Sequence, residues 1–123
     1  MVTPIKANNG GYKMNENKII LEGIPASPGT ATGRVKVLTT FMDYKFNAGD
    51  ILVARETNPQ YTIQILKAAA IITDVGGPLS HAAIISREIG IPCVTSTEKA
   101  TQVLKDDMEV IVDGTNGKVY TKC

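Results

Sequence analysis

Residues 71–94 constrain the fold more than any other part of the sequence. This stretch opens with an apolar run typical of a strand, is broken by two consecutive glycines, and continues after Ser80 with apolar residues at helical spacing. Gly90 suits the position just beyond a helix end, and Pro92 cannot continue a helix. The sequence therefore predicts strand, glycine turn, helix and strand, the right-handed crossover unit of a parallel sheet. In such sheets ligands bind at the carboxyl edge, where the glycine turn would lie.

His81 is the only histidine of the chain, and it would occupy the first helical position with Ser80 as the N-cap. The ring would then stand beside free backbone N–H groups and the positive end of the helix dipole, which favour a neutral imidazole with a free lone pair. The same amides would stabilise an anion on that nitrogen, and a phosphoryl group is the obvious example. Gly76 and Gly77 would leave room for this anion to approach the backbone.

Taken alone, this local pattern also permits plainer interpretations. A histidine at a helix start is often only a polar first-turn residue, and two glycines are often only a turn. The sequence favours no metal site, because there is no second histidine and Cys93 and Cys123 lack ligand spacing. A thiol protease built on Cys93 and His81 is disfavoured too, since nothing supplies an orienting partner or an oxyanion site.

The same stretch resembles the phosphohistidine segment of the phosphoenolpyruvate-utilising enzymes, the group that includes pyruvate water dikinase, pyruvate phosphate dikinase and rifampicin phosphotransferase. The positions that match the motif of this family are Thr73, Asp74, Gly76, Gly77, Ser80, His81, Ala82, Ala83, Ile84, Arg87, Glu88, Gly90, Ile91, Pro92 and Val94. The likeness continues outward to Gly23 on one side and to Val119 on the other. The resemblance implies that His81 is transiently phosphorylated and that the chain adopts a swivelling β/β/α fold.

Two positions depart from the pattern of the family. Leu79 stands where plant-type pyruvate phosphate dikinases carry a regulatory threonine, so control by phosphorylation at that position is not expected. Pro78 replaces a residue that is often Arg, Leu or Met, which removes one cation that could face the phosphate. Neither change affects the nucleophile.

The resemblance also implies a division of labour among domains. In these enzymes an ATP-grasp nucleotide-binding domain phosphorylates the histidine. The mobile domain then carries the phosphoryl group to a second site, usually a barrel that interconverts pyruvate and phosphoenolpyruvate with magnesium. This chain has no Walker-type glycine loop and is too short for either partner domain, so we expect a phosphocarrier that is not catalytically complete alone. ATP and magnesium are expected on the partner domains, with no cofactor on this one. The alternative is a domain of the same fold that binds a partner or an anion without being phosphorylated.

Charge and hydropathy narrow the expected setting. A net charge of +1 with no Lys/Arg cluster argues against a nucleic-acid surface. The N-terminus lacks the apolar core of a signal peptide, and no apolar run approaches membrane length. Two cysteines are too few for a disulfide scaffold, so we expect a reduced, cytoplasmic setting.

The rest of the chain predicts one domain behind a polar lead. Residues 1–18 show no hydrophobic period and are expected to be flexible, either as a natural linker or as a tag ahead of an original start at Met14; residues 19–123 form the domain. The sequence predicts strands at 19–22, 30–38 and 51–54, a loop rich in proline and glycine at 23–29, a short helix at 100–104, and a hairpin of 109–113 with 118–122. These elements predict a three-layer α/β fold with helices, a mostly parallel central sheet and a smaller antiparallel sheet.

Helical spacing predicts which side chains are buried. A helix should begin at Pro59, capped by Thr57 or Asn58. Its expected inner face holds Tyr61, Thr62, Ile65, Leu66 and Ala69, with Gln64 and Lys67 opposite. In the helix of His81, the expected buried stripe is Ala82, Ile85 and Ile89, and the neighbouring face holds His81, Ile84 and Glu88.

Three side chains near His81 have two possible roles each, and a fourth has one expected role. Ile84 either packs beneath a loop or helps to dock His81 into a partner's active site. Ser80 either caps the helix alone or also binds the phosphate. Arg55 is either exposed or reaches the phosphate from a neighbouring strand, and Arg87 is expected to form a surface ion pair.

Overall fold

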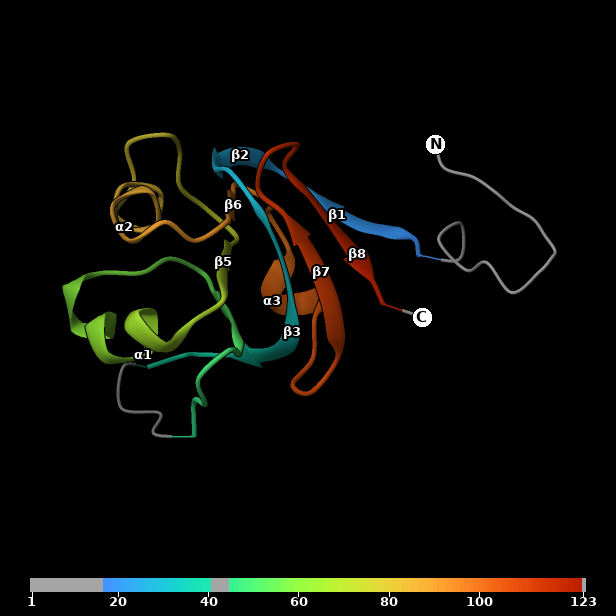
Figure 1. Cartoon of the computed structure of the whole chain (residues 1–123), viewed down its shortest axis with the longest axis horizontal. Helices are drawn as coiled ribbons and strands as arrows, with labels where there is room; N and C mark the ends of the chain where they lie inside the picture. The colour runs from blue at the N-terminus through green and yellow to red at the C-terminus, as the bar shows by residue number, and fades with distance from the viewer. Residues whose placement is uncertain (1–16, 41–44, 123) are drawn as a thin grey trace, which may run out of the picture.

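The computed structural model describes residues 17–40 and 45–122, and the predicted flexible lead lies almost wholly outside these residues. In chain order the strands are β1 (Ile19–Glu22), β2 (Ile24–Ser27), β3 (Thr30–Val37), β4 (Ile51–Ala54), β5 (Ala70–Thr73), β6 (Cys93–Thr95), β7 (Glu109–Asp113) and β8 (Lys118–Thr121). The helices are the 3-10 helix η2 (Pro59–Tyr61), α1 (Thr62–Lys67), α2 (His81–Ile89) and α3 (Ala100–Val103). Figure 1 shows α1 and α2 on one side of the strands and β7 and β8 on the other.

The strands form one mixed sheet in the order β1-β8-β7-β3-β4-β5-β6-β2. Strands β3 to β6 pair in parallel, whereas β1, β8, β7 and β3 pair antiparallel, and β2 runs antiparallel to β6 at the far edge. Strand β3 belongs to both parts, because its first half pairs with β7 and its last residues pair with β4. The predicted combination of a parallel and an antiparallel layer is therefore confirmed, with one strand continuous between the two.

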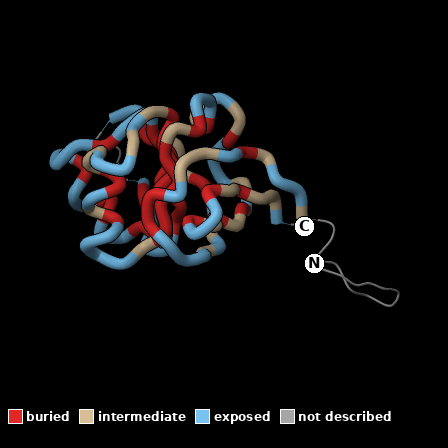
Figure 2. Tube along the Cα trace, turned by 90° about the horizontal axis from the view of Figure 1, so that it is seen from above, coloured by how far each residue is buried: buried red, intermediate tan, exposed pale blue. Residues whose placement is uncertain are grey.

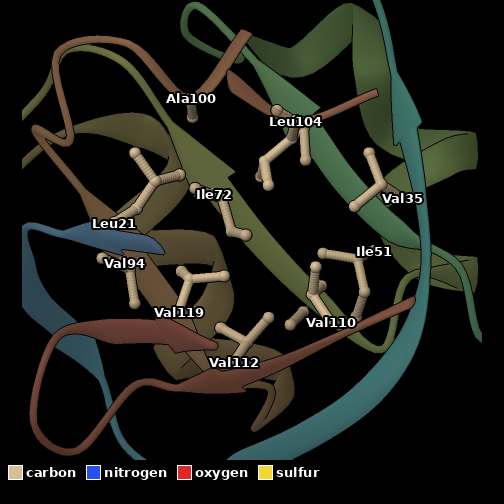
Figure 3. Close-up of a cluster of buried hydrophobic side chains, with 12 residues drawn as sticks. Leu21, Val35, Ile51, Ile72, Val94, Ala100, Leu104, Val110, Val112 and Val119 are labelled. Atoms are coloured by element: carbon tan, nitrogen blue, oxygen red, sulfur yellow. The ribbon is translucent and has the colours of Figure 1, made fainter. Parts of the chain in front are cut away.

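Buried side chains lie on both faces of the parallel part, which explains why β4 is apolar throughout and β5 is apolar up to the buried Thr73 at its end. In β4, Ile51 and Val53 join a cluster with residues of β7 and β8, and Leu52 and Ala54 join a second cluster with residues of α1 and α2. Figure 3 shows the first cluster, in which Ile72 and Ile51 meet Val110 and Val112. Figure 2 shows the buried positions running through the middle of the molecule. The two clusters define three layers, as predicted.

Strand β2 corrects one expectation, because residues 24–27 were predicted to lie in an irregular loop. Pro25 lacks the N–H that a central strand needs, but β2 lies at the edge of the sheet, where proline is tolerated. Strands β1 and β2 are consecutive in the chain yet form the two opposite edges of the sheet. The link between them is Gly23, whose N–H donates to the carbonyl of Gly117 at 2.8 Å. We call this junction, with Gly23, Gly114 and Gly117, the seam.

The buried faces of the helices α1 and α2 also differ from the prediction. In α1 the buried residues include Gln64 and Ile65, whereas Thr62 and Leu66 are exposed. The buried positions still keep the spacing of one helical face, namely Tyr61, Gln64, Ile65 and Ala68. The prediction was wrong because it assigned the faces by polarity, whereas the polar Gln64 is buried and the apolar Leu66 is exposed.

The helix α2 approaches the sheet through small side chains. Its buried residues are Ala82, Ala83 and Ser86, while Ile85 is partly buried and Ile89 is exposed. The predicted stripe is thus correct at Ala82 and wrong at Ile89. Among the described residues, no helix is long and apolar enough to cross a membrane.

Candidate functional site

Helix α2 begins and ends where the sequence predicted. Ser80 is the N-cap in extended conformation, and its Oγ accepts a hydrogen bond from Ala83 N–H at 3.4 Å and donates to the carbonyl of Gly77 at 2.9 Å. At the other end Gly90 is left-handed, with φ of 79°, and its N–H bonds the carbonyl of Ser86. His81 therefore occupies the first position of the helix.

Free amides surround the start of α2. No hydrogen bond of the described residues engages the backbone N–H groups of His81 or Ala82, whereas those of Ala83 and Ile84 bond to Ser80. Two unpaired donors at the positive end of the helix dipole can bind an anion.

The two glycines of the turn differ. Gly76 has φ of 122°, and a Cβ placed there would lie 3.1 Å from the side chain of Ser80, so the turn requires glycine at this position. At Gly77 a Cβ would meet no heavy atom within 4 Å. The space that the sequence predicted beside the turn therefore exists at Gly77, and the roles of both glycines in holding a phosphoryl group stay predictions.

Sequence reasoning missed the residue that orients the histidine ring. The Oγ1 atom of Thr57, a buried residue just beyond β4, lies 2.9 Å from Nδ1 of His81. Asn58, not Thr57, caps the following helix, because its side chain accepts a bond from the N–H of Gln60. One signal in the sequence could have found Thr57. It follows β4, which is parallel to β5, and the carboxyl ends of parallel strands lie at the same edge of the sheet as the turn before His81.

The contact with Thr57 distinguishes the two nitrogens of the ring. Nδ1 is held by a hydroxyl, whereas Nε2 of His81 makes no hydrogen bond within the described part of the chain. A neutral imidazole carries a proton on only one nitrogen. When Nδ1–H donates to Thr57, the lone pair is on Nε2.

A cleft of about 260 Å³ opens at this carboxyl edge of the sheet. Its lining includes Glu56, Thr57, Thr73, Gly76, Ser80 and His81. Of the four predicted site residues the structure brings His81, Gly76 and Ser80 together here, whereas Gly77 is not part of the lining.

Two charged side chains follow β4 at the rim. Arg55 Nη1 donates to Glu56 Oε2 at 3.1 Å, and both side chains are exposed. Glu56 lines the His81 cleft, whereas Arg55 lines an adjacent cleft of about 360 Å³. Arg55 is thus exposed, as one of its two predicted roles required.

Among the described residues Arg87 has no ion-pair partner, contrary to the prediction. Its guanidinium donates to the carbonyls of Ala26 at 2.7 Å and Pro78 at 2.6 Å. The prediction was wrong because backbone carbonyls of β2 and of the turn lie within its reach. Arg87 therefore ties the loop that precedes His81 to the edge of the sheet.

Asp74 and Cys93 are buried near the site without lining the cleft. The carboxylate of Asp74 accepts bonds from the N–H and the hydroxyl of Thr101, which anchors the end of β5 to α3. Burial raises the pKa of the Cys93 thiol to about 11, so this thiol is protonated near neutral pH and is not a nucleophile. In the described part of the chain, no group of three or more His, Cys, Asp or Glu side chains could hold a metal ion.

Sequence comparison gives a consistent set of relatives. The family model described as "PEP-utilising enzyme, mobile domain" matches residues 46–117. The phosphoenolpyruvate synthase of Pyrococcus furiosus is 51% identical over 109 residues, covering 88% of this chain and 13% of that protein. The probable phosphoenolpyruvate synthase of Archaeoglobus fulgidus is 52% identical over 106 residues, covering 85% of this chain and 14% of that protein. The uncharacterized phosphotransferase YvkC of Bacillus subtilis is 49% identical over 108 residues, covering 87% and 13%. The chain thus spans only a small part of each of these relatives.

Solved structures share the fold. The solution structure of the Enzyme I protein nEIt aligns with a TM-score of 0.56 and 31% identity, covering 68% of this chain and 34% of that chain. Aconitase X of Thermococcus kodakaraensis aligns with a TM-score of 0.62 at 22% identity, covering 84% of this chain and 98% of that chain. The second likeness concerns the fold alone.

Proposed function

Because this chain belongs to the family of mobile domains of phosphoenolpyruvate-utilising enzymes, we propose that it is a phosphocarrier domain that accepts a phosphoryl group on Nε2 of His81. The observation that carries the proposal is the 2.9 Å contact between Thr57 Oγ1 and His81 Nδ1 beside a cleft. A purely structural histidine has no need of a fixed ring with one nitrogen left free at the start of a helix.

The chemistry follows from the fixed ring. In the tautomer that carries its proton on Nδ1, this nitrogen donates to Thr57 Oγ1 at 2.9 Å and leaves the lone pair on Nε2. That lone pair attacks the phosphorus while the bond from phosphorus to the leaving oxygen of the donor breaks. The imidazole is then positively charged, and the Thr57 hydroxyl accepts the hydrogen bond of the Nδ1 proton, which stabilises that charge. The ring needs no separate base, because the attacking nitrogen carries no proton.

The phosphoryl oxygens would be held by backbone groups. The unpaired N–H groups of His81 and Ala82 and the dipole of α2 favour an anion at this point. Gly76 and Gly77 give the phosphoryl group access to the backbone, and Ser80 positions the helix start as its cap. Phosphoryl transfer relies on such positioning and charge stabilisation more than on covalent help from the protein.

The partners are inferred from the relatives. Those relatives are named phosphoenolpyruvate synthases, and this chain matches about an eighth of their length. We infer that an ATP-grasp nucleotide-binding domain supplies the phosphoryl group, and that a domain binding phosphoenolpyruvate and pyruvate receives it. ATP and magnesium would then be bound by those domains and not by this one.

Exposed apolar side chains next to His81 fit a surface that meets these partners. Leu79 is 82% exposed just before the cap, and Ile84 is 41% exposed one turn into α2. Ile84 is thus not sealed beneath a loop, which favours the docking role over the packing role. Large apolar side chains that flank a reacting nitrogen can exclude water when the domain docks.

Labelled ATP offers the direct test. The purified chain is incubated with a separately produced nucleotide-binding domain and γ-labelled ATP, and the label is tested for stability in acid and base. We expect an acid-labile, base-stable label that is absent from the His81→Ala variant. Ser86→Ala, a buried substitution on the same helix, is the matched control and should still be labelled. No label on the folded wild-type chain would instead favour a domain that binds a partner or an anion without being phosphorylated.

A further inference from the structure

The His81 cleft contains a charge of the wrong sign for a phosphate site. Of the residues that line this cleft in the described part of the chain, Glu56 is the one with a charged side chain, and it is negative. A phosphoryl group on His81 carries close to two negative charges. The Glu56 carboxylate therefore repels the group that the cleft is proposed to hold.

Arg55 compensates this charge in the structure. Its Nη1 lies 3.1 Å from Glu56 Oε2, with the two side chains 69% and 64% exposed. Exposed pairs of this kind add little to stability, so the pair is not needed for folding. Its effect on a nearby anion is a separate matter, because charges act over several ångströms in the partly screened environment of a surface.

The backbone keeps Arg55 close to the cleft. The carbonyl of Arg55 accepts the N–H of Val75 at 3.1 Å, and Val75 lines the His81 cleft. Arg55 therefore lies beside the start of the glycine turn, one residue beyond β4, the strand that pairs with β5. The field of Glu56 extends in the other direction as well, since burial and then Glu56 raise the pKa of Tyr61 in the adjacent cleft.

We propose that Arg55 and Glu56 are opposing charges that set the lifetime of the phosphohistidine at His81. Glu56 destabilises the phosphoryl group and so keeps it easy to transfer. Arg55 pairs with Glu56 in the free domain, and it turns from that carboxylate to the phosphoryl oxygens once His81 is modified. This inference rests on the proposed phosphorylation of His81, and it adds the electrostatic control of that state.

The affected step is the loss of the phosphoryl group to water. A water oxygen attacks phosphorus, the bond from Nε2 to phosphorus breaks, and its electron pair returns to Nε2. The ring keeps its Nδ1 proton and becomes neutral, and dihydrogen phosphate leaves with both protons of the water. A nearby positive charge stabilises the negatively charged phosphohistidine, and it slows the loss of the phosphoryl group through a metaphosphate-like transition state. A nearby negative charge has the opposite effect.

A small chemical donor tests the pair without any partner domain. Phosphoramidate transfers its phosphoryl group to Nε2 and releases ammonia, and the half-life of the product at His81 is followed by ³¹P NMR after removal of the reagent. Arg55→Gln should shorten the half-life about three- to tenfold, the effect of one unit charge near a protein surface. Glu56→Gln should lengthen it by a similar factor, and the double variant should lie near the wild type.

Controls separate this effect from general charge and from structure. Arg34→Gln and Glu22→Gln change the same net charges on exposed residues of β3 and β1, and should leave the half-life unchanged. Arg55→Lys should restore most of the stability of the phosphohistidine. The differences should shrink in high salt, because exposed charges are screened.

The outcomes distinguish the inference from the proposed function. Equal half-lives in the two single variants, shifts in the same direction, or equal shifts in the controls would overturn the inference. Failure of phosphoramidate to modify His81 in the folded chain would overturn it too, because there would be no phosphohistidine whose lifetime the two charges could set. In a further outcome, phosphoramidate gives the expected half-lives while ATP and a nucleotide-binding domain give no label. That pair of results would refute the proposed carrier function, and the role of the charge pair would stand.

Discussion

Gly114 of the seam and Gly77 of the His81 turn differ in what surrounds the missing side chain. At the seam, a Cβ on Gly114 would lie 2.0 Å from the carbonyl oxygen of Ser27 and 2.9 Å from the backbone nitrogen of Cys93. At the turn, a Cβ on Gly77 would meet nothing within 4 Å. At Gly114 the missing side chain lets three backbone segments touch, whereas at Gly77 it leaves open space. We therefore expect substitution of Gly114 to change stability and substitution of Gly77 to change chemistry.

Gly114→Ala should have the largest effect. The new methyl group meets backbone atoms that cannot rotate away, so the free energy of unfolding should fall by about 3 kcal/mol or more. Urea denaturation measures this as a lower midpoint at constant slope. A loss below about 1 kcal/mol would show that the seam can open, and the contrast with the turn would fail.

Cys93, whose backbone nitrogen lies beside Gly114 of the seam, makes the folding stability depend on pH. The pKa of the buried Cys93 thiol is raised from 9.0 to about 11, so between these values the unfolded chain releases a proton that the folded chain retains. Folding stability is therefore full below about pH 9 and falls as the pH rises to about 11, by roughly 2 kcal/mol. The difference between wild type and Cys93→Ala isolates this contribution from other titrating groups. Parallel pH profiles of the two proteins would contradict it.

Substitutions of Ser80 should affect both the stability of the fold and the chemistry at His81. Ser80→Ala removes the cap of α2 and should lower the free energy of unfolding by about 1 kcal/mol. Ser80→Asp retains a capping oxygen, so its stability should stay near the wild type, but it adds a negative charge beside His81 and should prevent phosphorylation. Thermal unfolding and phosphoramidate labelling of both variants provide the measurement. Efficient labelling of Ser80→Asp would argue against an anion site at this helix start.

Gly77→Ala should have the smallest effect on stability. Its methyl group enters open space, so the free energy of unfolding should change by no more than about 0.5 kcal/mol. The same methyl group occupies space beside the turn, so we expect slower labelling of His81 by phosphoramidate. Labelling at the wild-type rate would remove Gly77 from the phosphoryl site.

Local sequence rules predicted the central unit well because its ends carry strong markers. Ser80 and Gly90 act through their own side chain and backbone, so the bounds of α2 follow from short-range physics. The apolar runs of β4 and β5 likewise required burial on both faces, which a parallel sheet beneath helices provides.

The errors arose where distant segments meet. Strand β2 pairs with β6, which is far away in the chain, and Pro25 within β2 and Pro28 just after it favoured a loop in the sequence. The contact of Thr57 with His81 joins residues 24 positions apart, and no local pattern records it. In α1 the polar Gln64 is buried and the apolar Leu66 is exposed, so assigning the faces by polarity selected the wrong side of the helix.

The nitrogen that carries the phosphoryl group tests the central claim most directly. The chain is labelled with ¹⁵N in its single histidine and phosphorylated, and ³¹P–¹⁵N coupling identifies the modified atom. With Nδ1 held by Thr57, we predict a phosphorus bonded to Nε2 of His81. Phosphorus on Nδ1, or on a residue other than His81, would contradict the account.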